Sequence, residues 1–247
     1  MTEELFRQDG YLRECAATVT ALGAQGIVLD RTVFYPLGGG QAGDAGVLVL
    51  ADGSELAIAD TRKGKDEEGR LTGDICHLPA PGTQDAVARL KVGDAVTARV
   101  DWERRHRLMR FHTATHLLCH LVPQLVNGCS ITPEYARLDF NMTEPLDKEA
   151  LTSGIARLVA GAHAVEVGSI TDEELDANPA LVKSMSVQPP RGTGSIRTIR
   201  IAGVDGPLDL QPCGGTHVAN TAEIGAVVVT KIEKKSATTR RVVLGFA

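Results

Sequence analysis

The chain has 247 residues, of which 43% are hydrophobic and 23% are charged, and its formal net charge is −5. These values are typical of a globular protein with one large domain or two modest ones, and they argue against a general nucleic-acid coat protein. The longest apolar runs, such as residues 224–229, are too short to span a bilayer. The acidic N-terminal residues lack the layout of a signal peptide, so we expect a cytoplasmic protein without a membrane segment.

Residues 1 to about 100 have the pattern of short β-strands separated by turns. Asp52-Gly53 is typical of a hairpin between two of these strands. The predicted strands are residues 15–22, 26–29, 47–50, 55–59 and 95–100. The periodicity changes from two to about 3.6 at residues 101–103, which predicts a domain of residues 1–101 and another of residues 102–247.

Residues 103–122 give the strongest helix prediction of the chain. Pro123 argues for an end near that position. The expected core stripe recurs at helical spacing and consists of Leu108, Phe111, Thr115, Leu118 and Val122.

The rest of the second half combines helices and strands. Residues 147–162 predict a helix with Asp147 as its N-cap, and Thr171 with Glu174 fits a capping box at the start of a shorter helix. Strands are predicted at residues 135–140, 196–201, 226–232 and 241–246. The second half is therefore expected to be α+β.

Three histidines on the predicted helix suggest a metal site. His112 and His116 are four residues apart, so both face the same side of the helix and can share one ion. His116 and His120 form an equally good pair, whereas His112 and His120 are about 12 Å apart along the axis. Spacing alone does not choose between the two pairs.

A second motif, Cys213-Gly-Gly-Thr-His217, supplies a thiolate and an imidazole around a turn of small residues. The five cysteines are odd in number and widely spaced, so a metal is a better use for Cys213 than a disulfide. A histidine pair with Cys213 and His217 is a tetrahedral set that suits zinc. Four protein ligands are typical of a structural zinc, because catalytic sites usually keep an open position. Metalloprotease activity is not expected, since Thr113 stands where those enzymes carry a catalytic glutamate.

At three separated segments the sequence resembles the editing region of alanyl-tRNA synthetases, and most closely the free-standing AlaX-type trans-editing proteins. The segments are residues 34–46 with their Gly-Gly-Gly-Gln run, residues 112–116, and residues 213–217 followed by Glu223-Ile224-Gly225. The resemblance implies an N-terminal β-barrel-like domain and an α+β zinc-containing editing domain. It also implies that His112 and His116 are the helical ligands, and that no aminoacylation domain is present.

The implied activity is hydrolysis of tRNA-Ala that carries serine or glycine in place of alanine. A pocket for alanine excludes an added hydroxyl only about 10²-fold, so a second site that hydrogen-bonds this hydroxyl is needed. The resemblance favours Thr32 as the residue that reads it. Backbone N–H groups of Gly39 and Gly40 and the amide of Gln41 are suited to holding the ester carbonyl or a water.

Zinc could activate water if one of the four ligands is absent or loosely bound. If all four bind, we expect zinc to position the amino group or the ribose hydroxyl of the substrate. tRNA phosphates would be met by basic residues, with Arg104 and Arg105 pointing outward from the helix and Arg107 turned toward its buried side. The proposed contacts are Arg104, Arg105, Lys234, Lys235, Arg240 and Arg241. Residues 236–241 lack the glycines that the family usually has in this loop.

The sequence is also compatible with two alternative functions. One is a non-catalytic module that binds tRNA or a synthetase and contains a structural zinc. The other is an enzyme for a small ester or amide, which would not need a basic face.

Overall fold

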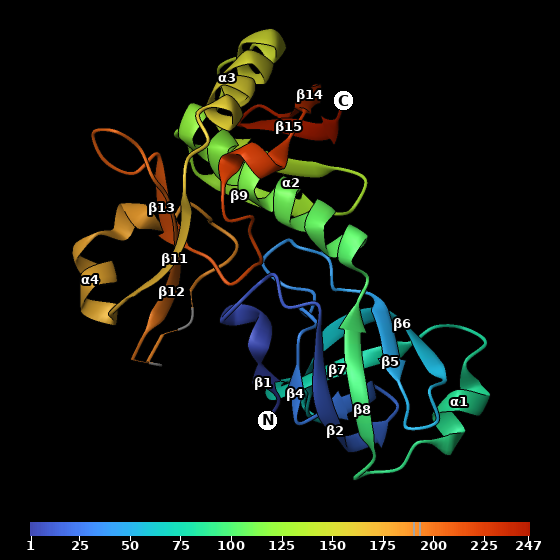
Figure 1. Ribbon diagram of the computed structural model, residues 1–247. Helices are drawn as coiled ribbons and strands as arrows, with labels where there is room; N and C mark the ends of the chain where they lie inside the picture. Colours follow the sequence, from blue (N-terminus) through green and yellow to red (C-terminus); the bar gives the residue numbers. More distant parts are fainter. Residues whose placement is uncertain (190, 193) are drawn as a thin grey trace. The chain divides into compact units, whose positions relative to one another are not determined.

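The computed structural model describes residues 1–189, 191–192 and 194–247, and its contacts divide the chain into two units (Figure 1). The first unit is Met1–Gly38 with Ala42–His106, and the second is Gly39–Gln41 with Arg107–Ala247. The prediction of a mixed α and β chain with several sheets is confirmed. The second unit includes the tripeptide Gly39–Gln41, although sequence periodicity places these residues in the first predicted domain.

The first unit is built on one antiparallel ladder in the order β2-β3-β7-β6-β5-β8, and β8 pairs back with β2. Its strands are β2 (Glu14–Gly23), β3 (Gly26–Leu29), β5 (Gly46–Val49), β6 (Glu55–Lys65), β7 (Leu71–Pro79) and β8 (Ala95–Val100). The short strands β1 (Glu3–Glu4) and β4 (Arg31–Thr32) pair in parallel, and the unit also contains η1 (Leu5–Arg7) and α1 (Gln84–Arg89).

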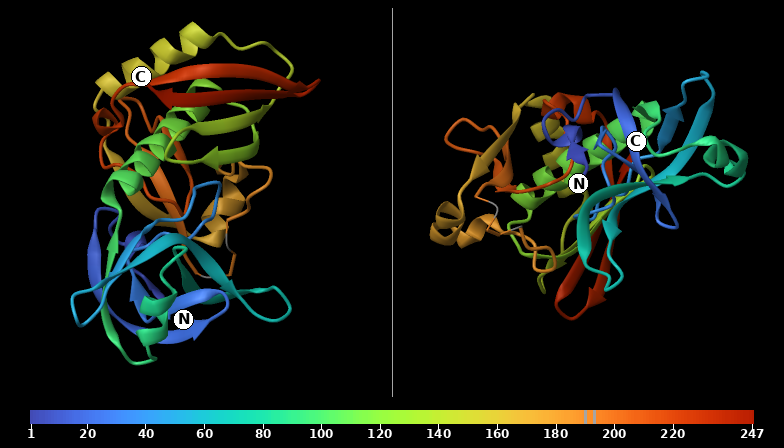
Figure 2. Two further views of the ribbon diagram at one scale, coloured as in Figure 1. Left: turned by 90° about the vertical axis from the view of Figure 1, so that its right-hand side faces the viewer. Right: turned by 90° about the horizontal axis from the view of Figure 1, so that it is seen from below.

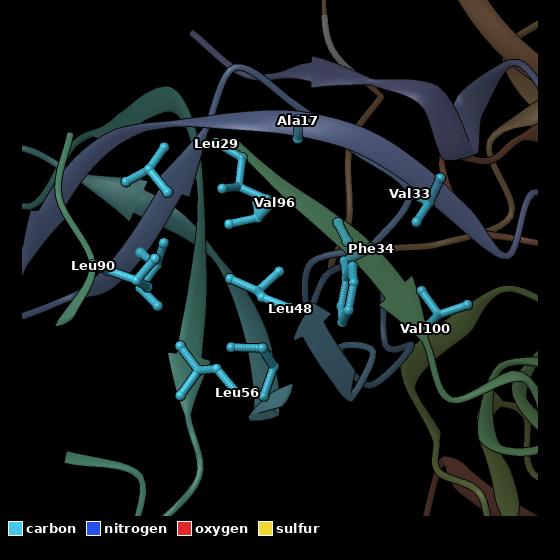
Figure 3. Packing of buried hydrophobic residues seen from close by; sticks show 13 residues of the cluster. Ala17, Leu29, Val33, Phe34, Leu48, Leu56, Leu90, Val96 and Val100 are labelled. Atoms are coloured by element: carbon cyan, nitrogen blue, oxygen red, sulfur yellow. The ribbon is translucent and has the colours of Figure 1, made fainter. Parts of the chain in front are cut away.

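Buried and exposed side chains alternate along several of these strands, and the buried ones form a mainly aliphatic core. Leu29, Leu48 and Leu56 are completely buried and meet Phe34 in one cluster (Figure 3). The buried Ala98 belongs to the same cluster. The predicted hairpin at Asp52-Gly53 is confirmed, because β5 and β6 pair on either side of it. β7 was not predicted, because Ile75, Cys76 and His77 are buried in succession and give no period of two.

The described residues of the second unit form two antiparallel sheets. The first has the order β14-β15-β10-β9, and the second has the order β11-β12-β13 (Figure 1). The strands of the first sheet are β9 (Val126–Ile131), β10 (Ala136–Asn141), β14 (Val227–Ser236) and β15 (Thr239–Phe246), and those of the second are β11 (Val165–Ile170), β12 (Ile196–Ile201) and β13 (Asp209–Pro212).

The long helix α2 (Trp102–Leu121) confirms the main helix prediction, and all five residues of its predicted core stripe are buried. Asp147 caps α3 (Lys148–Ala160), and Thr171 and Glu174 form the predicted capping box of α4 (Asp172–Ala177). Helix α3 packs against β14, as the left view of Figure 2 shows. Two 3-10 turns, η2 (Pro179–Leu181) and η3 (Thr221–Ile224), complete the unit. In the described part of the chain, no helix combines the length and apolar character that crossing a membrane requires.

Candidate metal centre

The second unit brings His112 and His116 of α2 together with Cys213 and His217 of the loop after β13. One ligand atom from each residue can be chosen so that all four atoms lie within 4.8 Å of one another. The Sγ atom of Cys213 is 3.4 Å from Nε2 of His112 and 3.3 Å from Nε2 of His217. One sulfur and three imidazole nitrogens at this spacing could hold a metal ion.

The turn between Cys213 and His217 packs closely against His112 and is hydrogen-bonded to Arg197. A Cβ atom on Gly215 would overlap the His112 ring, so only glycine fits there. The side chain of Arg197 donates hydrogen bonds to the carbonyl oxygens of Cys213 (2.6 Å) and Gly215 (3.0 Å). The backbone N–H of Cys213 also donates to Arg197, so the turn is fixed to β12.

Each of the three histidines donates its Nδ1–H to a different buried acceptor. The Thr113 hydroxyl donates to the carbonyl oxygen of Met109 and therefore accepts from the His217 ring. The three bonds are His112 to Gln41 Oε1 (2.7 Å), His116 to Asp209 Oδ2 (2.8 Å) and His217 to Thr113 Oγ1 (3.2 Å). In the neutral form of each ring, this leaves Nε2 without a proton and able to bind a metal, the arrangement that usually orients metal-binding histidines.

Charge around the centre favours a cation. Burial raises the pKa of the Asp209 carboxyl, but His116 and Lys183 lower it to about 2. Burial lowers the pKa of His116, whereas Asp209 and Cys213 raise it to about 9. Burial raises the pKa of the Cys213 thiol, and the neighbouring histidines bring it well below its ordinary value. A divalent ion is suited to these negative groups because it can replace the shared protons.

His120 lies outside this group, although its spacing is as good as that of His112. Its side chain is exposed, and Nδ1 donates to the carbonyl oxygen of Leu208 at 2.7 Å. The Cys213–His217 loop lies beside His112 and His116, and this position distinguishes the first histidine pair from the second.

Gly39–Gln41 is tied to the metal centre within the second unit. Gly40 has φ +87°, and a Cβ atom there would lie 2.8 Å from the Cys129 sulfur, so this position requires glycine. Gln41 is fully buried, and its amide oxygen accepts from His112 and from the backbone of Thr216 (3.1 Å). Its amide nitrogen donates to the Thr216 hydroxyl at 2.9 Å. Both polar atoms of the Gln41 side chain are thus hydrogen-bonded to His112 or to Thr216 of the Cys213–His217 loop.

Thr32 lies on β4 in the first unit and is also fully buried. Its hydroxyl lies 2.8 Å from Nε2 of His77 and accepts from the backbone N–H of Phe34 at 3.0 Å. No pattern in the sequence predicts His77 as a partner of Thr32, because the two residues are 45 positions apart.

The predicted outward direction of Arg105 is wrong. Its side chain is completely buried in the first unit, where Nε lies 3.0 and 2.9 Å from the two carboxylate oxygens of Asp44. The guanidinium also donates to the carbonyl oxygens of Gly10 and Val33. A buried carboxylate requires such a partner, so the ion pair fixes this rotamer. Arg104 is half-buried and donates to the carbonyl of Gly43 at 3.1 Å.

The prediction that Arg107 turns toward the buried side of the helix is also wrong, because its side chain is exposed. Its guanidinium lies over the ring of Phe246, 4.6 Å from the centroid. The helix therefore presents Arg107 to solvent and buries Arg105.

The basic residues of the β14–β15 hairpin differ in their contacts. Lys234 and Lys235 are exposed near its end. Arg240 is buried and donates to the carbonyl oxygens of Ser236 and Thr143. Arg241 forms two bonds with Asp139, of 2.7 and 2.8 Å. The lysines are therefore accessible, whereas both arginines bind protein acceptors.

Two family models match parts of the chain. The Threonyl and Alanyl tRNA synthetase second additional domain matches residues 196–243, which include Cys213 and His217, and the tRNA synthetases class II (A) model matches residues 7–104. The chain is 33% identical to the alanyl-tRNA editing protein AlaX-M of Saccharolobus solfataricus over 98% of both chains. It is 34% identical to AlaX-M of Methanosarcina mazei, over 98% of this chain and 95% of the relative.

The chain belongs to the AlaX-M family of alanyl-tRNA editing proteins. The predicted family resemblance is therefore confirmed. An alanine–tRNA ligase of Saccharolobus islandicus is 31% identical over 94% of this chain, but the match covers only 25% of the ligase. This AlaX-M family member thus corresponds to one quarter of that ligase.

Proposed function

We propose that this chain hydrolyses the ester bond of tRNA-Ala that carries serine or glycine. The observation that carries the proposal is the group formed by His112, His116, Cys213 and His217, in a chain that matches AlaX-M proteins along nearly its whole length. The N-terminal ladder would correspond to the barrel-like domain of the family and residues 102–247 to its editing domain.

We propose zinc as the metal, because one thiolate and three oriented imidazoles are the donor set that zinc prefers. His112, His116, Cys213 and His217 would hold it, and the bound ion would supply Lewis acidity to orient the amino acid or ribose. Four protein ligands favour this positioning role over activation of water.

The chain's own residues would do the remaining work. Backbone N–H groups of Gly39 and Gly40 are proposed to hold the ester carbonyl and to stabilise the oxyanion as it forms. Gln41 would keep this loop against the metal ligands through its bonds to His112 and Thr216. Thr32 is proposed to accept a hydrogen bond from the serine hydroxyl, which alanine cannot donate.

The deciding experiment is the release of serine, glycine and alanine from separately charged tRNA-Ala, with zinc-loaded and chelator-treated protein. We expect the seryl ester to be cleaved at least about 10²-fold faster than the alanyl ester, since alanine leaves a buried acceptor unpaired. Binding of tRNA without release of any amino acid would instead identify a non-catalytic module with a structural zinc.

Lys234 and Lys235 are proposed to bind tRNA phosphates. Reversing both charges in a Lys234→Glu/Lys235→Glu variant should raise KM about tenfold and leave kcat nearly unchanged, because such contacts position the substrate without taking part in the transition state. The dependence of binding on salt should become shallower. A Lys65→Glu/Lys148→Glu variant makes the same charge change at exposed lysines elsewhere and should have a smaller effect. An equal effect of both variants would mean that the hairpin makes no specific contact.

A further inference from the structure

His77 is an unusual residue for its place in the fold. It lies on β7 with no exposed surface, in a unit whose core is mainly aliphatic. The ring of Phe34 meets the imidazole edge-on, with 5.1 Å between centroids and an interplanar angle of 80°. A buried imidazole is costly unless both nitrogens are hydrogen-bonded, and here both are.

The partners of His77 define its tautomer. Nδ1 lies 3.0 Å from the carbonyl oxygen of Ile27, which can only accept, so Nδ1 carries the proton. Burial lowers the pKa of His77 to about 4, so the ring is neutral at pH 7 and Nε2 is an acceptor. The Thr32 hydroxyl, 2.8 Å from Nε2, must therefore donate its only proton to His77.

The direction of the Thr32 hydroxyl follows from these bonds. Its oxygen donates to His77 and accepts from the N–H of Phe34. Within the part of the chain that the structure describes, one lone pair is left, and no proton is left to donate. Any further partner of this hydroxyl has to be a hydrogen-bond donor.

We infer that His77 is a positioning residue that makes Thr32 an acceptor-only reader of the substrate's side-chain hydroxyl. The inference rests on the proposed role of Thr32 in serine selection. Without an acceptor at position 77, the Thr32 hydroxyl would be free to rotate. It could then donate as well as accept, and the site would distinguish less well between substrates with and without a hydroxyl donor. His77 acts through Thr32 and is not itself a substrate contact.

The test compares three esters of tRNA-Ala: seryl, alanyl and 2-aminobutyryl, in which a methyl group replaces the serine hydroxyl. The ratio of kcat/KM for the seryl and 2-aminobutyryl esters isolates the hydroxyl from side-chain size. His77→Leu should lower this ratio about fivefold, since one neutral hydrogen bond contributes about 1 kcal/mol. His77→Gln, whose amide oxygen can replace Nε2 as the acceptor, should retain most of the ratio. In a Thr32→Val background, His77→Leu should change the ratio no further.

A purely structural role for His77 would slow all three esters equally and leave the ratio intact, which would overturn the inference. An additive effect of His77→Leu in the Thr32→Val background would overturn it as well. If Thr32→Val alone leaves the ratio unchanged, the proposed role of Thr32 fails instead. Should His77→Leu not fold, the tautomer remains testable by long-range ¹H–¹⁵N spectra of the unmutated protein and Thr32→Val. The inference is supported if Nδ1 of His77 carries the proton and if Thr32→Val changes the ¹⁵N chemical shift of Nε2 but not that of Nδ1. Protonation at Nε2 in the unmutated protein contradicts the inference.

Discussion

Replacing Cys213 with alanine is expected to remove the proposed zinc ion and, with it, the proposed hydrolysis of seryl-tRNA-Ala. Structural zinc in small domains is bound with about 10–16 kcal/mol, so one ligand of four carries on average about 2.5–4 kcal/mol. Removing one ligand should therefore weaken the affinity for zinc about 10²- to 10³-fold. We expect about one zinc per chain in the unmutated protein and almost none in Cys213→Ala after gel filtration, as measured by metal analysis.

Two further variants make this result specific. Asp209→Asn keeps all four ligands but weakens the support of His116, and such partners typically contribute a factor of 10–100 in affinity. His120→Ala removes an exposed histidine of the same helix and should leave the metal content at about one per chain. Loss of zinc in His120→Ala, or full retention in Cys213→Ala, would refute the ligand set.

Replacing Thr32 with valine is expected to reduce the preference for seryl over alanyl esters by about 10- to 100-fold. Valine preserves the shape of the side chain and removes the oxygen that would accept the serine hydroxyl. The serine hydroxyl then enters the site without a partner, which costs about 1–3 kcal/mol, while the alanyl ester gains because no buried acceptor is left unpaired. The measurement is kcat/KM for both esters, together with the zinc content to show that the metal centre is intact.

Thr61→Val provides a matched control for this substitution. Thr61 is another completely buried threonine of the first unit, and its hydroxyl donates to the carbonyl oxygen of Asp44 at 2.9 Å. We expect Thr61→Val to lower stability and to leave the selectivity unchanged. Equal loss of selectivity in both variants would indicate general loosening of the unit, and unchanged selectivity in Thr32→Val would exclude Thr32 as the reader.

Local sequence signals predicted much of the secondary structure. The apolar repeat of α2, the cap at Asp147 and the capping box of Thr171 and Glu174 all act within a few residues, so periodicity and capping rules were sufficient. The strand β13, by contrast, is only four residues long, and β7 shows no alternation. Such strands are specified by their hydrogen-bonded neighbours, which sequence patterns do not identify.

The sequence by itself determined the donor types of the candidate metal site, because two histidines at i and i+4 and a Cys-Gly-Gly-Thr-His turn are local patterns. Spacing left His112 and His120 equivalent beside His116, and the choice of His112 came from the family resemblance. In physical terms the tertiary structure decides between them, because it brings the Cys213–His217 loop against His112. The orienting partners Gln41 and Asp209 also come from remote segments. Arg105 was misjudged for the same physical reason: a charged side chain is buried when a distant carboxylate neutralises it, and Asp44 is 61 residues away.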